Sequence, residues 1–255
     1  MLDRIQLKRE AKEIVRSARV SAYLFALLYL VVTNVLSLID TYVSGTVVKD
    51  LQTLQLYYPE VQVPDFLLAA QRIPGTVTVF VSVMVMLLLA VLNAGWALYH
   101  LGVRRGEEMP YTTLFDGFSF VGKVILLEIV VSIYVILWSL LFVIPGVIAA
   151  YRYRFAVYNL CENPEMGVME AMHMSMVQTH GHKADLFILD LTFLGWQLLC
   201  TLTLGILSIW IAPYVIQTNL GYFQQIKKMK NVGWFPPQPG DDGQFHAQDP
   251  FGPNV

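Results

Sequence analysis

The chain has 255 residues, of which 56% are hydrophobic and 14% are charged, and its mean hydropathy is +0.54. These values exclude an ordinary soluble domain of this length and favour an integral membrane protein. The formal net charge of −2 gives no indication of a nucleic-acid partner.

The amino-terminal segment, residues 1–19, is charged throughout and lacks the short apolar core and cleavage site of a signal peptide. Its apolar residues recur at helical spacing: Leu7, Ala11, Ile14, Val15 and Ala18. The basic residues fall mostly on other faces. We predict an amphipathic helix that lies in the membrane interface against anionic lipid. A plain basic flank on the cytoplasmic side is the alternative.

Long apolar regions follow this segment. They cover 20–43, 76–100, 119–161, 184–204 and 206–226. A membrane span needs about 20 residues, so the third region is long enough for two spans. Pro145 and Gly146 interrupt it and are typical of a hairpin tip. Gly205 separates the last two regions in the same way.

The predicted fold is therefore an all-α, polytopic membrane bundle over residues 20–226. It contains six transmembrane helices in three hairpins, at about 20–43, 76–100, 119–144, 147–161, 184–204 and 206–226. The largest exposed segment between them is an outer loop, 44–75, whose aromatic and proline residues suit an interfacial lid.

Two further segments lie on the opposite side. Asn163 as an N-cap and Pro164 at the first helical position predict an interfacial helix over 164–178. Its methionines recur at helical spacing and form a flexible apolar face against lipid or protein. The last residues, 227–255, are rich in Pro, Gly and Asp without periodicity, and they predict a disordered cytoplasmic tail.

Lysine and arginine residues are distributed unevenly between the two sides. Thirteen of the 17 fall on the side of the amino terminus, whereas only Lys49 and Arg72 fall on the other. Since loops with excess positive charge remain in the cytoplasm, both termini are predicted to be cytoplasmic.

Several stretches in the second half carry a family resemblance. They are WSLLFVIPGVIAAYRYRFAVYNLCENP at 138–164, EAMHMS at 170–175, Gly181, DLFILDLTFLGWQLLCTLTLGI at 185–206 and APY at 212–214. In this order they resemble the bacterial integral membrane family catalogued as domain of unknown function 975. The resemblance implies a multi-pass protein of the bacterial cytoplasmic membrane and no chemistry. A weaker likeness, to the membrane region of glycerophosphodiesterases, rests on the Pro-Gly, Arg and E-A-x-x-x-S pattern.

Polar side chains inside the predicted spans are candidate functional residues, because an ionised group near the bilayer centre costs several kcal/mol unless paired or hydrated. Five of them lie at a similar depth in the cytoplasmic half: Asn93, Glu128, Arg154, Asp190 and Asn219. We predict that they form one buried polar cluster, with Arg154 paired to Asp190 or Glu128. The cluster either holds the helices in register or lines a cavity for a polar solute, an ion or a lipid head group.

Arg152 does not fit this cluster, because two residues along a helix correspond to a rotation of about 200°. We expect it to meet another partner or a lipid phosphate. The alternative for Arg152 and Arg154 is that both snorkel to the head groups.

No pattern in the sequence predicts a cofactor, a metal site or catalysis. His173, His180 and His182 lack the spacing of metal ligands. Glu128 and Asp190 have no base or metal motif beside them. The sequence therefore favours a non-enzymatic protein that organises, regulates or assists a protein partner or a lipid process. The alternative is a small transporter or lipid-handling protein with a polar cavity in the cytoplasmic half.

Overall fold

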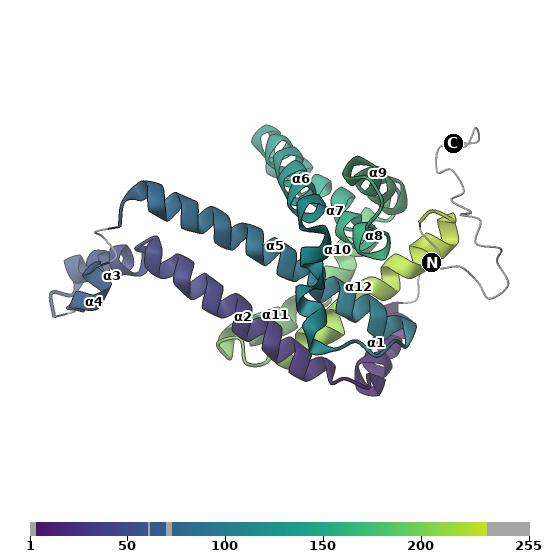
Figure 1. Ribbon diagram of the computed structural model, residues 1–255, viewed down its shortest axis with the longest axis horizontal. Helices are drawn as coiled ribbons and strands as arrows, with labels where there is room; N and C mark the ends of the chain where they lie inside the picture. The colour runs from purple at the N-terminus through teal and green to yellow at the C-terminus, as the bar shows by residue number, and fades with distance from the viewer. Residues whose placement is uncertain (1–3, 61, 70–72, 234–255) are drawn as a thin grey trace.

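The computed structural model describes residues 4–60, 62–69 and 73–233, and within these ranges it contains helices and no strand (Figure 1). In chain order the helices are α1 (Arg4–Ser17), α2 (Ala22–Val43), α3 (Thr46–Tyr57), α4 (Asp65–Leu68), α5 (Gly75–Arg105), the 3-10 helix η2 (Tyr111–Phe120), α6 (Val121–Leu141), α7 (Val143–Tyr153), α8 (Ala156–Glu162), α9 (Val168–Thr179), α10 (Lys183–Leu191), α11 (Leu194–Leu202) and α12 (Ser208–Lys230).

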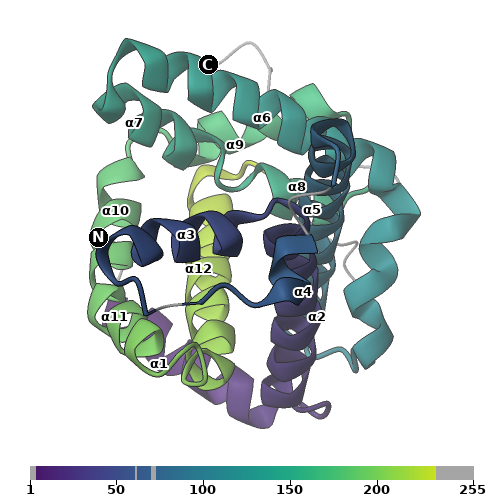
Figure 2. The ribbon, with the colours of Figure 1, turned by 90° about the vertical axis from the view of Figure 1, so that its left-hand side faces the viewer.

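Helices α2 and α5 pack against each other as a long antiparallel arm, with α3 and α4 at one end and α1 near the other (Figure 1). Figure 2 shows α12 in the middle of the molecule, between α11 on one side and α2 on the other. The α6–α7 hairpin leaves the arm obliquely, and α9 packs along it.

Aromatic stacking joins α2 and α5 at the end of the arm near α1. The rings of Phe25 and Tyr99 stack with centroids 3.6 Å apart, and those of Tyr29 and Trp96 lie 4.6 Å apart. The buried Tyr99 hydroxyl donates a hydrogen bond of 2.8 Å to the carbonyl of Val20. This aromatic core, whose buried Tyr99 hydroxyl has a hydrogen-bond acceptor, fixes the arm against the rest of the protein.

Four helical segments are long and apolar enough to cross a membrane: 22–43, 75–105, 111–141 and 183–202. Most of the residues in these segments are not buried inside the protein, and many exposed side chains on them are large and apolar. Such a surface is suited to lipid. The described chain is therefore all-helical with four candidate membrane helices. The helices α7, α8 and α12 pack against them.

The hairpin predicted at Pro145 and Gly146 turns earlier than expected. Phe142 is the extended residue, with φ −162° and ψ 155°, and the Pro-Gly pair lies in the first turn of α7. Proline is tolerated there because the first turn needs no amide donor. A Cβ atom on Gly146 would lie 2.0 Å from Ser139 Oγ, so this glycine permits the close approach of α6 and α7.

The helix predicted over 164–178 begins four residues later than expected, at Val168, and ends at Thr179. Asn163 caps a short turn instead, accepting a hydrogen bond of 3.2 Å from the amide of Glu165. The helix start belongs to Gly167, whose amide donates to the Glu170 carboxylate at 3.3 Å. The sequence carried a second helix start that competed with the first.

Two other boundaries also differ from the prediction. α12 continues to Lys230, so the disordered tail predicted from residue 227 does not begin there, and residues 234–255 lie outside the described residues. The predicted outer loop 44–75 contains the helices α3 and α4. Thr46–Tyr57 is free of proline and glycine, which allows a helix where we expected irregular structure.

Helix α1 packs on α12, with Leu7, Ala11 and Val15 buried. The Arg4 guanidinium pairs with Asp185 at 2.9 Å, and Lys8 Nζ donates to Thr192 at 2.7 Å. The apolar stripe of this amphipathic helix is thus covered by protein in the structure.

Candidate functional site

The first group of interest surrounds Arg154, at the end of α7. Its guanidinium forms a double hydrogen bond with the Asp190 carboxylate of α10: Nη1 donates to Oδ2, and Nη2 donates to Oδ1 at 2.8 Å. The same Nη2 donates to Asn219 Oδ1 of α12 at 3.1 Å. Tyr151 donates its hydroxyl to Asp190 Oδ2 at 2.7 Å. We call these four residues the Arg154 cluster.

The two charged groups of the Arg154 cluster, the guanidinium of Arg154 and the carboxylate of Asp190, neutralise each other. A two-pronged arginine–carboxylate pair is the strongest type of side-chain hydrogen bond in proteins, and here it joins three helices. The side chains of Arg154 and Asp190 are 23% and 31% exposed, so the pair is mostly enclosed. The arrangement holds α7, α10 and α12 in register.

Glu128 and Asn93 lie apart from this cluster, whereas the sequence placed all five residues in one layer. They line a separate cavity of about 360 Å³, together with Asp40 and Ser82. Ser82 donates to Asp40 Oδ1 at 2.5 Å. Similar depth along a helix axis does not fix the direction of a side chain around that axis, and α6 turns Glu128 toward α5 rather than toward α10.

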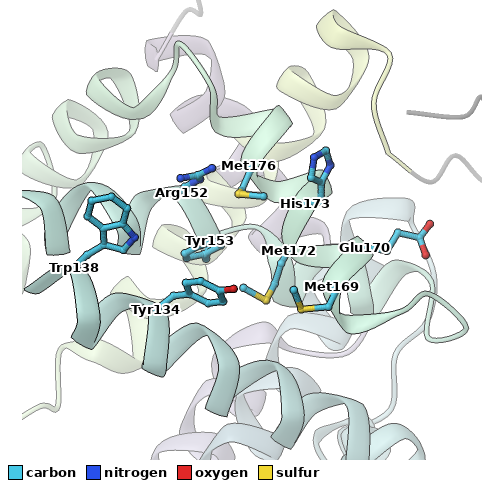
Figure 3. Close-up of a pocket in the computed structure, with 9 residues that line it drawn as sticks. All are labelled: Tyr134, Trp138, Arg152, Tyr153, Met169, Glu170, Met172, His173 and Met176. Atoms are coloured by element: carbon cyan, nitrogen blue, oxygen red, sulfur yellow. The ribbon is translucent and has the colours of Figure 1, made fainter. Parts of the chain in front are cut away.

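Arg152 lines a larger cavity, of about 720 Å³, between α6, α7 and α9 (Figure 3). The remaining lining residues are Tyr134, Trp138, Tyr153, Met169, Glu170, Met172, His173 and Met176. Figure 3 shows the Arg152 guanidinium near Trp138 and Met176, with Tyr134 and Tyr153 between Trp138 and the methionines of α9. We call this space the Arg152 cavity.

The backbone of Arg152 is held firmly although its side chain is not. The carbonyl of Arg152 accepts hydrogen bonds from Ser175 Oγ at 2.9 Å and from Thr179 Oγ1 at 3.2 Å, both on α9. Among the residues that the structure describes, none forms a hydrogen bond or ion pair with its guanidinium. The guanidinium carbon lies 5.9 Å from the centre of the Tyr153 ring.

A buried ion pair at the end of α12 was not predicted from the sequence. Lys227 Nζ donates to Glu162 Oε2 of α8 at 2.5 Å, and Arg105 lies 3.7 Å from the same carboxylate. Lys227 follows the buried Leu220 and Phe223 by seven and four residues, so the helical repeat already placed it on the buried face. Because a disordered tail was predicted from residue 227, Lys227 was not assigned to a buried helix face.

The two partners of this pair respond to burial in opposite directions. Burial raises the pKa of Glu162, and the nearby Lys227 and Arg105 lower it only in part. Burial lowers the pKa of Lys227, which Glu162 offsets in part. Each shift favours the neutral form because desolvation outweighs the attraction.

Two buried amides interlock beside this pair. Asn159 of α8 donates to Gln178 Oε1 at 2.9 Å, and Gln178 of α9 donates back to Asn159 Oδ1 at 3.0 Å. The described residues contain no group of three His, Cys, Asp or Glu side chains placed to hold a metal ion. Asn159 and Gln178 thus satisfy each other across α8 and α9.

The comparisons with known proteins give one match. A family model described as "Protein of unknown function (DUF975)" matches residues 1–156 and 140–230. The weaker likeness to the membrane region of glycerophosphodiesterases is not shown by this match. No curated protein and no solved structure matches the chain.

Proposed function

This chain belongs to the DUF975 family of proteins of unknown function, and we propose that it is a non-enzymatic, multi-pass protein of a bacterial cytoplasmic membrane that organises or regulates a partner or a lipid process. In this proposal six spans form three hairpins: the four candidate membrane helices and the segments 147–161 and 206–226. Both termini are cytoplasmic.

The distribution of charge supports this orientation. Lys49 of α3 lies at the α3–α4 end of the arm, whereas α1 carries five basic residues and the end of α12 carries three. An excess of basic residues marks the cytoplasmic side of a membrane protein. The α3–α4 end therefore faces outward in the proposal.

The observation that carries the non-enzymatic role is the Arg154 cluster. Its arginine, carboxylate, amide and hydroxyl groups bind one another and link three helices. Groups engaged in this way stabilise helix packing and leave no free acid, base or nucleophile among them. The surfaces available for contact in this proposal are those of α1, α9 and the end of α12.

Thiol labelling in intact membranes tests both parts of the proposal. Single cysteines replace exposed Ser17, exposed Thr53 or Asn219 in a chain without Cys161 and Cys200. A membrane-impermeant reagent added from outside should label position 53 alone, and one added from the cytoplasmic side should label position 17. Position 219 should be protected from both sides.

A different labelling pattern would contradict specific parts. Labelling of position 17 from outside would reverse the orientation. Labelling of position 219 in a folded variant would mean that the Arg154 cluster is hydrated.

The second candidate function, a small transporter or lipid-handling protein, is favoured by the two cavities between helices. One contains Asp40, Ser82, Asn93 and Glu128, and the other contains Arg152. Labelling of position 219 would favour this alternative over the organising role.

A further inference from the structure

The Arg152 cavity combines one charged group with an extended apolar lining. Arg152 is the single lysine or arginine among its lining residues, and tyrosine, tryptophan and methionine side chains form most of the remainder. At about 720 Å³ the cavity has the size of a small-molecule site and far exceeds an inorganic phosphate ion. A ligand that fills it has an anionic end and an apolar body.

The charge of Arg152 is available to such a ligand. Its guanidinium has no hydrogen-bond or ion-pair partner among the described residues, and its carbon lies 5.9 Å from the centre of the Tyr153 ring. The carboxylate of Glu170 caps the first turn of α9, and in Figure 3 it points away from Arg152. The cavity therefore offers an anion one cation without a competing carboxylate beside it.

The apolar lining is adaptable and continuous with the outer surface. Met169, Met172 and Met176 place flexible thioethers along α9, a side chain type that adjusts to irregular apolar groups. Trp138 and Met169 are 42% and 59% exposed. An acyl chain could thus enter from the side of the α6–α7 hairpin without crossing the protein.

A head group on the cytoplasmic side lies within reach of Arg152. The hydrogen bonds from Ser175 and Thr179 to the Arg152 carbonyl place Arg152 directly beside α9. In the proposed topology Arg152 lies inside the span 147–161, nine residues from its cytoplasmic end, and the chain continues into α9 on that side. An arginine stem can carry its charge from within a span toward a lipid phosphate.

We propose that the Arg152 cavity binds one anionic phospholipid, with its phosphate on the Arg152 guanidinium and the start of an acyl chain against the methionines of α9. This inference rests on the membrane placement in the proposed function. The inference adds a class of ligand and a binding site to the proposed function.

Binding is measured on the full chain purified in a non-ionic detergent, by native mass spectrometry. The probes are a short-chain phosphatidylglycerol, a phosphatidylcholine of the same chain length and inorganic phosphate. We expect one phosphatidylglycerol per chain, bound about ten-fold more tightly than phosphatidylcholine. A charge-assisted hydrogen bond is strong, and the cationic choline group brings the net charge of the phosphatidylcholine head group to zero and lies beside Arg152.

The decisive variant is Arg152→Gln, with Arg152→Lys and Arg16→Gln as controls. Arg152→Gln should weaken phosphatidylglycerol binding about ten-fold, whereas Arg152→Lys should retain most of it. Arg16→Gln removes the same charge from an exposed position of α1 and should change nothing. The contacts between α7 and α9 use the backbone of residue 152, so the variants keep them.

A second pair of variants tests the lining without touching Arg152. Met169→Glu places a carboxylate at the exposed rim and should weaken binding of phosphatidylglycerol. Met229→Glu makes the same change at a similarly exposed methionine of α12 and should not.

Three results would overturn the inference. They are wild-type affinity in Arg152→Gln, equal affinity for phosphatidylcholine, and displacement of the lipid by an equal concentration of inorganic phosphate. The last result would make free phosphate the ligand. Because binding in detergent does not depend on orientation, failure here leaves the thiol-labelling test of the proposed function intact.

Discussion

Arg152 and Arg154 are two residues apart on the same helix, yet their surroundings differ completely. Arg154 binds Asp190 and Asn219 from two other helices, whereas Arg152 faces a cavity, with its guanidinium carbon 5.9 Å from the centre of the Tyr153 ring. The rotation of about 200° between them on a helix separates the two environments. A charge within an apolar segment is therefore structural or available for a ligand according to the helix face that carries it.

The largest effect should come from breaking the Arg154 cluster. Asp190→Ala leaves the Arg154 guanidinium without its carboxylate in a mostly enclosed site. We expect the free energy of unfolding to fall by about 3 kcal/mol, the cost of an uncompensated charge. Denaturant titration of the purified chain measures it. A loss no larger than that of Arg152→Ala would erase the distinction between the two arginines.

Removing both partners should cost much less than removing one. In the double variant Arg154→Met with Asp190→Leu no buried charge remains, and apolar residues of similar volume fill the space. We expect most of the lost stability to return, leaving a deficit of about 1 kcal/mol or less. The same titration measures it. A double variant as unstable as Asp190→Ala would mean that the pair does more than offset its own desolvation.

The buried pair of Glu162 and Lys227 offers a pH test. Lys227→Met removes the attraction that lowers the pKa of Glu162, so this pKa, already raised by burial, should rise further. A raised folded-state pKa gives stability that is present below the ordinary carboxyl range and is lost as pH rises through the folded value. The variant should therefore lose about 2 kcal/mol near neutral pH and recover part of it on acidification.

The control for this test is Lys228→Met, at the exposed neighbouring position. Its stability should follow the wild type at each pH between 5 and 8. Parallel stability curves for Lys227→Met and the wild type over this range would contradict the assigned burial of Glu162.

Gly146→Ala tests the wall of the Arg152 cavity. The added Cβ would meet Ser139 Oγ at 2.0 Å and push α7 away from α6. We expect a loss of about 1–2 kcal/mol, typical of overpacking. Gly122→Ala, in α6 with nothing within 4 Å of its Cβ, should be neutral or slightly stabilising. Equal effects in the two variants would exclude a special role for Gly146.

Arg152→Ala should have the smallest effect on stability, within about 0.5 kcal/mol, since its guanidinium has no hydrogen-bond or ion-pair partner among the described residues and only a distant ring contact is lost. Denaturant titration of Arg152→Ala and Asp190→Ala under the same conditions compares the losses in their free energies of unfolding. A loss above 2 kcal/mol would show that Arg152 has a structural partner after all.

The helix positions followed from the sequence better than the packing did. Hydropathy predicted α2, α5 and α12 within a few residues, because each is a long apolar run. It also placed Arg154, Asp190 and Asn219 at one depth, and these three meet. Glu128 was misplaced because depth carries no information about rotation around a helix that is apolar on every side.

Local signals failed where two of them competed. Asn163 with Pro164 and Gly167 with Glu170 are both helix starts, and tertiary packing selected the second. The Pro-Gly pair is compatible with a turn and with a first helical turn, and in the structure it lies in the first turn of α7, where Gly146 leaves room for Ser139 of α6. Choices of this kind depend on residues distant in the sequence, so no local pattern contains them.

The carbonyl of Arg152, which accepts hydrogen bonds from Ser175 and Thr179, has a consequence for the evolution of this chain. The frame between α7 and α9 is held by a main-chain atom, which every amino acid at position 152 supplies. A mutation there can alter or abolish the charge in the cavity while the helices keep their places. Selection can therefore retune what this cavity accepts in a single step, without passing through an unstable intermediate sequence.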